Sequence, residues 1–73
     1  ASPAEQALKE LRKKIEATSE DVGRDFAREA RAIHEGEAPA RAIIGEVAPD
    51  EARSLISDGV PVAPLPWSSR KSN

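Results

Sequence analysis

The chain has 73 residues, a formal net charge of −2, no cysteine, one Phe and one Trp. This length fits one small domain, whose core must be built from Leu, Ile, Val and Ala around Phe26. The composition excludes disulfides and argues against a dedicated nucleic-acid-binding domain, and no apolar run approaches the roughly 20 residues that cross a bilayer. We therefore expect a cytoplasmic protein with no membrane segment.

The segment SPAEQALKELRKKIEA, residues 2–17, is typical of an amphipathic helix. Ser2 and Glu5 have the spacing of a capping box, and Pro3 suits the first helical position. Apolar residues recur every three or four positions, which predicts one buried face. This face comprises Ala4, Leu8, Leu11 and Ile15.

A second helix is predicted over TSEDVGRDFAREARAIHEG, residues 18–36. Thr18 or Ser19 would cap its start, and Gly36 would end it in the left-handed conformation. Gly23 weakens the first turn, and a close approach to the first helix is one reason for a glycine there. The apolar stripe of this helix comprises Val22, Phe26, Ala30 and Ile33.

The helical pattern breaks at Pro39, and the apolar run AIIGEV, residues 42–47, is predicted to be extended and buried. A short third helix is expected in APDEARSLISDG, residues 48–59, beginning at Pro49 and ending at Gly59. Its inward-facing residues are expected to be Ala52, Leu55 and Ile56.

The segment VPVAPLPW, residues 60–67, cannot be helical because it contains three prolines. It is expected to lie across the helices as a strap, and its Pro-x-x-Pro spacing also fits a docking ligand. Val60 and Val62 are alternatively candidates to pair beside Ile43 and Ile44, in parallel across the third helix.

These elements predict a mainly α fold. It is a small three-helix domain over residues 1–67, with an extended connector, a proline-rich C-terminal strap and room for a minimal two-strand pairing. Residues 68–73 are expected to form a flexible tail.

The ordered run SEDVG--FA-EAR-IH-GE---R-I-GE----EA--L---G-PV-PLP carries a resemblance. Residues 8–66 resemble the C-terminal half of an uncharacterised bacterial family, one of the domains of unknown function. Members carry an N-terminal segment with paired CxxC motifs that looks like a zinc ribbon. The resemblance implies that this chain is the C-terminal domain of a longer protein. It also implies that zinc belongs to the missing segment, with no cofactor in this chain.

The resemblance brings no activity, but it directs attention to the polar positions of the run, which include Asp21. The candidate polar site consists of Arg31, His34, Glu37, Arg41 and Glu46. A histidine near the two carboxylates could transfer protons, and Arg41 could bind a carboxylate or phosphate. Structurally, His34 would instead complement a helix dipole, and Arg41 would form an ion pair that fixes the loop. Glu46 would pair with Arg41 or His34. No metal site is predicted, since zinc prefers Cys and His ligands and the chain has one His.

We expect a non-catalytic interaction or assembly module, with a protein partner or self-association, because bulky core residues are scarce and Trp67 follows the last clear core position. The alternative is a small-ligand or acid-base site built from His34, Glu37, Arg41 and Glu46. An enzyme needs these polar groups to converge on a cavity, whereas an interaction module does not.

Overall fold

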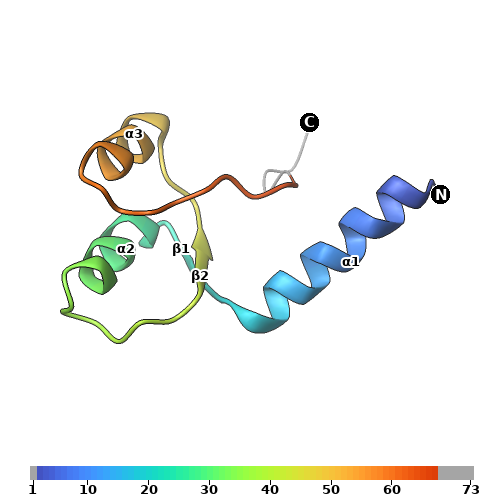
Figure 1. Cartoon of the computed structure of the whole chain (residues 1–73), viewed down its shortest axis with the longest axis horizontal. Coiled ribbons are helices and arrows are strands. Elements are labelled where there is room, and N and C mark those ends of the chain that lie inside the picture. The colour runs from blue at the N-terminus through green and yellow to red at the C-terminus, as the bar shows by residue number, and fades with distance from the viewer. Residues whose placement is uncertain (1, 68–73) are drawn as a thin grey trace.

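A computed structural model describes residues 2–67 of the chain, so the tail predicted at 68–73 lies outside the described residues. The elements follow in the order α1 (Pro3–Thr18), β1 (Glu20–Gly23), α2 (Phe26–His34), β2 (Ile43–Gly45) and α3 (Pro49–Ser57). The two strands form a parallel pair with α2 as their crossover, and α3 packs against α2, while α1 extends to one side (Figure 1). The mainly α composition with a small two-strand pairing is therefore confirmed.

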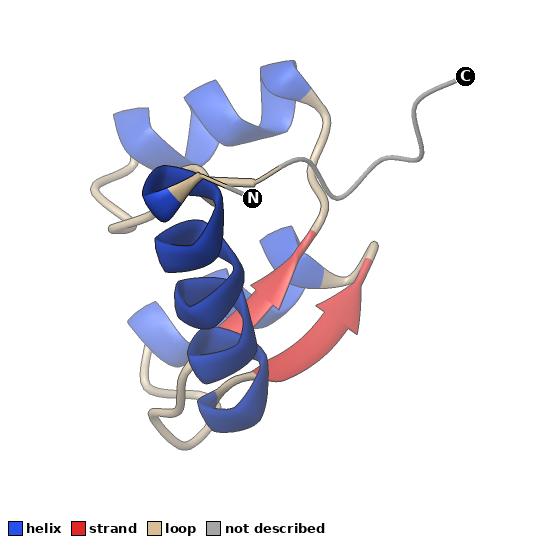
Figure 2. Ribbon diagram, turned by 90° about the vertical axis from the view of Figure 1, so that its right-hand side faces the viewer, coloured by secondary structure: helices blue, strands red, loops and turns tan. Residues whose placement is uncertain are grey.

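The start of α1 follows the sequence pattern, but its expected buried face does not. The Glu5 backbone N–H donates to the Ser2 hydroxyl, and the Ser2 N–H donates to the Glu5 carboxylate, each over 3.1 Å, so the capping box is confirmed. No residue of α1 is buried, and the side chains of Leu8 and Leu11 remain 39 % and 43 % exposed. The helix ends at extended Ser19 and leads directly into β1, which leaves α1 outside the packed helices (Figure 1). In the view of Figure 2, α1 lies in front of the other elements.

The helix predicted over residues 18–36 begins only at Phe26, because residues 20–23 form strand β1 instead. The Gly23 N–H donates to the Asp21 carboxylate over 2.9 Å, a local bond that competes with helical pairing. Gly23 itself has a φ of 57°, a left-handed conformation that turns the chain toward α2. The explanation of Gly23 as a contact with the first helix is therefore wrong.

The strand pairing also differs from the expected one. β2 pairs with β1 across α2, in the register Glu20↔Ile43 and Asp21↔Ile44, and not with Val60 and Val62 across α3. The two strands come close where Gly23 meets Gly45. A Cβ at Gly45 would lie 2.5 Å from the Gly23 carbonyl oxygen and 2.9 Å from the Phe26 Cβ. Only a residue without a side chain fits between β1 and α2 at this point.

The core lies where α2, α3 and the segment 60–67 meet. Leu55 of α3 is fully buried, as predicted, but Ile56 is 62 % exposed, because the next residue of a helix is rotated by about 100°. The buried residues are Ala27, Ala30, Leu55 and Val60, with Phe26, Ile43, Val47 and Val62 packed against them.

The segment 60–67 follows the left-handed turn at Gly59, whose φ is 81°. It contains no helix or strand and runs back across the molecule toward β2 and α1 (Figure 1). The Val60 N–H donates to the Leu55 carbonyl oxygen over 2.9 Å and closes the end of α3. Val60 is only 4 % exposed, so the first residue of this segment belongs to the core.

Adjacent residues of α3 provide a test of this core. Replacing Leu55 with Ala should lower the free energy of unfolding by about 2–5 kcal/mol, because it opens a cavity in a fully buried position. Ile56→Ala should change it by only about 0.5 kcal/mol, since Ile56 is mostly exposed. Urea denaturation of both variants measures the difference, and equal losses would contradict the placement of the core.

The close approach of the strands gives a second test. Gly45→Ala should cost about 3 kcal/mol, because the new methyl group overlaps backbone that cannot move aside. Gly36→Ala is the matched control. It introduces strain of about 1 kcal/mol at a φ of 78° but meets no atom within 4 Å. If thermal melting shows equal losses for the two variants, the strands are not packed this closely.

Candidate functional site

Arg41 connects three parts of the fold. Its Nε donates to Glu20 of β1 over 2.9 Å, and its Nη2 donates to Glu29 of α2 over 2.8 Å. These hydrogen bonds, first that to Glu29 and then that to Glu20, raise the pKa of Arg41 above its ordinary value, so the group stays charged. The ion pair that fixes the loop is confirmed. Glu46, the partner proposed from the sequence, is not part of it.

Arg31 connects α2 to the end of α3. Its Nη1 donates to the Asp58 carboxylate over 2.7 Å, and its Nη2 donates to the Ser54 hydroxyl over 3.0 Å. The guanidinium group therefore uses its fork geometry on a side chain of α3 and on the residue that caps it. Arg31 and Arg41 are both engaged in holding elements of the fold together.

The other three candidates are exposed. His34 is the last residue of α2, Glu37 lies in the following loop, and Glu46 follows β2. Within residues 2–67, no side-chain hydrogen bond or ion pair involves any of them, and none joins two of the five candidate residues. The described chain also holds no group of three or more acidic or histidine side chains that could bind a metal ion. The geometry does not bring the five residues together as one polar site.

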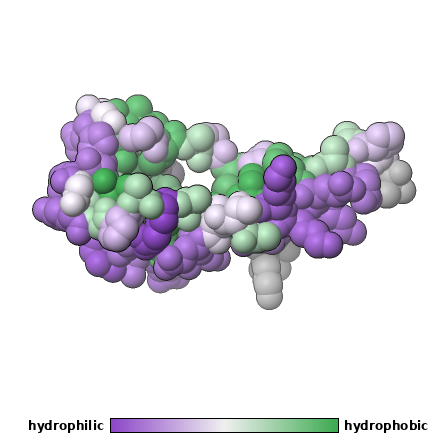
Figure 3. Space-filling model, turned by 60° about the horizontal axis from the view of Figure 1, so that its bottom comes forward, coloured by the Kyte–Doolittle hydropathy of each residue, from purple (hydrophilic) through white to green (hydrophobic). Residues whose placement is uncertain are grey.

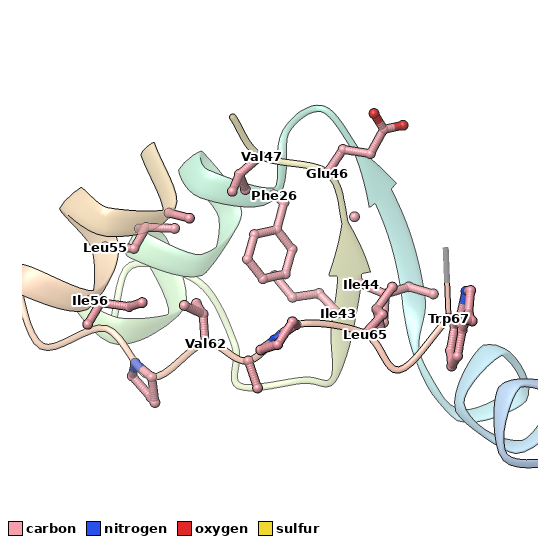
Figure 4. Close-up of a pocket in the computed structure, with 15 residues that line it drawn as sticks. Phe26, Ile43, Ile44, Glu46, Val47, Leu55, Ile56, Val62, Leu65 and Trp67 are labelled. Carbon is pink, nitrogen blue, oxygen red and sulfur yellow. The ribbon is translucent and has the colours of Figure 1, made fainter. Parts of the chain in front are cut away.

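An apolar groove, which the sequence did not predict, lies between β2, α3 and the segment 60–67. Its volume is about 510 Å³. Phe26, Ile43, Val62 and Leu65 are among its walls, and Trp67 lies at the end nearest α1 (Figure 4). Glu46 is its one charged lining residue, and its carboxylate points away from the groove (Figure 4). The sequence predicts burial for Phe26 and Ile43, but it does not predict the groove, because the walls of the groove come from segments far apart in the chain.

A second exposed apolar surface is the α1 stripe, defined as Ala4, Leu8, Leu11 and Ile15. Ile15 is half-buried, whereas the other three are exposed. Arg12 borders the stripe, where it bonds Glu16 over 3.2 Å and lies 5.5 Å above the Trp67 ring. Figure 3 shows hydrophobic surface on α1 directly beside strongly hydrophilic surface. The apolar spacing predicted this stripe correctly, but the prediction that the stripe is buried within the domain is wrong.

These features define a small helical domain with a parallel two-strand unit and two exposed apolar surfaces. Residues 1–70 match the family described as "Protein of unknown function (DUF1178)", and the chain belongs to this family. No curated protein and no solved structure matches the chain. In the part of the chain that the structure describes, no helix has the length and apolar character needed to span a membrane.

The role of Arg41 can be tested against that of His34. Arg41→Gln should lower the melting temperature by a few degrees, because Glu20 and Glu29 lose their shared partner. The melting temperature of Arg41→Lys should fall between those of the parent protein and Arg41→Gln. A lysine keeps the positive charge, but as a point charge it cannot bind both carboxylates with a rigid fork. His34→Ala, at the exposed end of α2, should melt like the parent protein.

The loss in Arg41→Gln should shrink as salt rises to about 1 M, because added ions screen partly exposed charges. Calorimetry at low and high salt measures both effects. A melting temperature that is unchanged in Arg41→Gln, or lowered more in His34→Ala, would contradict the structural assignment of these residues.

Proposed function

We propose that this domain is a non-catalytic interaction or assembly module, and that the α1 stripe is its contact surface. The observation that carries the proposal is the lack of any buried residue in a helix of 16 residues, two of whose leucines are 39 % and 43 % exposed. Contiguous exposed apolar surface rimmed by polar groups is the usual mark of a binding face.

The energetics of α1 support this proposal. An isolated helix of about 12–15 residues is marginal in water, and most helices gain their stability by packing an apolar face. Fully burying a leucine contributes about 1.5–3 kcal/mol, and part of this remains unrealised at Leu8 and Leu11, which are 39 % and 43 % exposed. A partner that covers the stripe would stabilise the helix and gain binding energy from the same contact.

The alternative, a small-ligand or acid-base site built from His34, Glu37, Arg41 and Glu46, has less support. Arg41 already pairs with two carboxylates of the fold, and the other three side chains are exposed without partners among the described residues. Such a dispersed arrangement cannot orient a substrate and a proton donor together.

The sequence supports a proposal about the longer protein to which this domain would belong. We propose a bacterial cytoplasmic protein in which a zinc-ribbon-like segment precedes this domain, supported by the resemblance of residues 8–66. We also propose that residues 60–67 act as a strap. The burial of Val60 and the packing of Val62 against the core support this role.

Position-specific photo-crosslinking in cells tests the contact surface. A photoreactive residue in place of Leu11 should give a crosslinked product of defined mass. The matched control replaces Lys13, which lies about 200° farther around the same helix and faces away from the stripe. The same background pattern at both positions would remove α1 as an interaction surface.

A further inference from the structure

We infer that the partner of the α1 stripe is a second copy of this chain, with the two α1 helices paired antiparallel. This inference rests on the proposed function, because it names the occupant of the same surface. It is supported by the spacing of the stripe, the sizes of its side chains and the charges at its edge.

The stripe has the spacing of a helix–helix seam. Its members, Ala4, Leu8, Leu11 and Ile15, follow steps of four, three and four residues. This alternation is the a and d pattern of a coiled coil, in which each side chain fits between those of the facing helix. A helix that packs on a sheet or a flat surface does not need so narrow a stripe.

The side-chain sizes decide between the two orientations. In an antiparallel pair, Ala4 faces the larger Ile15 of the second copy, and Leu8 faces Leu11, so no layer consists of two small side chains. A parallel pair would place Ala4 opposite Ala4 and Ile15 opposite Ile15. The layer of two small alanines would then be underpacked, which costs packing energy.

The charges favour the same orientation. Glu5 and Arg12 follow the seam residues Ala4 and Leu11 and lie along one edge of it. An antiparallel pair brings this edge against the same edge of the second copy, so that Glu5 meets Arg12 twice by symmetry. A parallel pair would place Arg12 beside Ala7 instead and would create no opposite-charge pair.

Arg12 is available for this contact. It donates its Nε to Glu16 over 3.2 Å, and its position above the Trp67 ring holds the guanidinium at the edge of the stripe. The remaining N–H groups of a guanidinium can serve a second carboxylate. Glu5 is exposed and keeps acceptor capacity beyond its bond to the Ser2 N–H.

The pair should be weak. A helix of 16 residues is about 24 Å long and supplies four layers, close to the lower limit for a stable coiled coil. We therefore expect a monomer–dimer equilibrium that shifts on dilution, visible by sedimentation velocity across a wide range of protein concentration.

Single cysteine substitutions can report the relative orientation of the two α1 helices, because the chain has no cysteine of its own. In the antiparallel pair, an equimolar mixture of Ala4→Cys and Ile15→Cys should form a disulfide-linked dimer under mild oxidation, and neither variant alone should do so. Efficient linkage of Ala4→Cys to itself would show a parallel pair and overturn the inference.

Complementary charge reversal gives an independent readout. Glu5→Lys and Arg12→Glu should each weaken self-association about tenfold, because each places like charges together. Their equimolar mixture should recover most of the lost affinity, since every edge pair is then opposite in charge. Glu5→Lys also breaks the Ser2–Glu5 capping box, and this box stays broken in the mixture. Recovery of affinity on mixing therefore reports the charge pairs and not the capping box. No recovery on mixing would overturn the antiparallel arrangement.

Two further outcomes separate this inference from the proposed function. The double variant Leu8→Gln, Leu11→Gln should be monomeric, and dimerisation at parental affinity would overturn the role of the stripe. A parent chain that stays monomeric at high concentration, while crosslinking at Leu11 yields a different protein, would overturn self-association and leave the interaction module standing.

Discussion

The fold depends on one close contact, the approach of β1 to β2 at Gly23 and Gly45. A Cβ at Gly45 would meet the Gly23 carbonyl oxygen at 2.5 Å, so the strands can pair this tightly only with glycine there. The Glu46 N–H also donates to the Gly23 carbonyl oxygen over 2.9 Å and fixes the end of the pair. Because parallel strands require a crossover, this contact determines where α2 lies.

The charged groups reinforce this arrangement from outside. Arg41 holds the loop before β2 against both β1 and α2, and Arg31 holds α2 against the end of α3. Side-chain ion pairs between exposed groups usually contribute little, but a shared arginine fixes geometry that so small a core cannot fix alone. Two of the polar residues that suggested a chemical site, Arg31 and Arg41, thus have a structural role in holding elements of the fold together.

Local signals in the sequence predicted much of this structure. The Ser2–Glu5 capping box, the left-handed turns at Gly36 and Gly59 and the burial of Leu55 follow from chemistry within a few residues. The strand β1 could not be predicted in this way. Its residues continue a helical pattern of apolar positions, and only pairing with a segment about 20 residues later stabilises the extended form. The groove was missed for the same reason, since its walls come from distant segments.

The burial of α1 was misjudged for a different reason, which bears on function. Periodicity shows that a helix has an apolar face, but it does not show whether that face meets the same chain or another one. Here the extended Ser19 and the start of β1 direct α1 away from the core, and the Leu8 and Leu11 side chains stay exposed. The rest of the domain, built from α2, α3 and the segment 60–67, closes its own small core with Leu55 and Val60. It does not need α1 to cover that core. This capped, amphipathic helix with an exposed apolar face is the reason for the proposal that α1 forms one half of an interface.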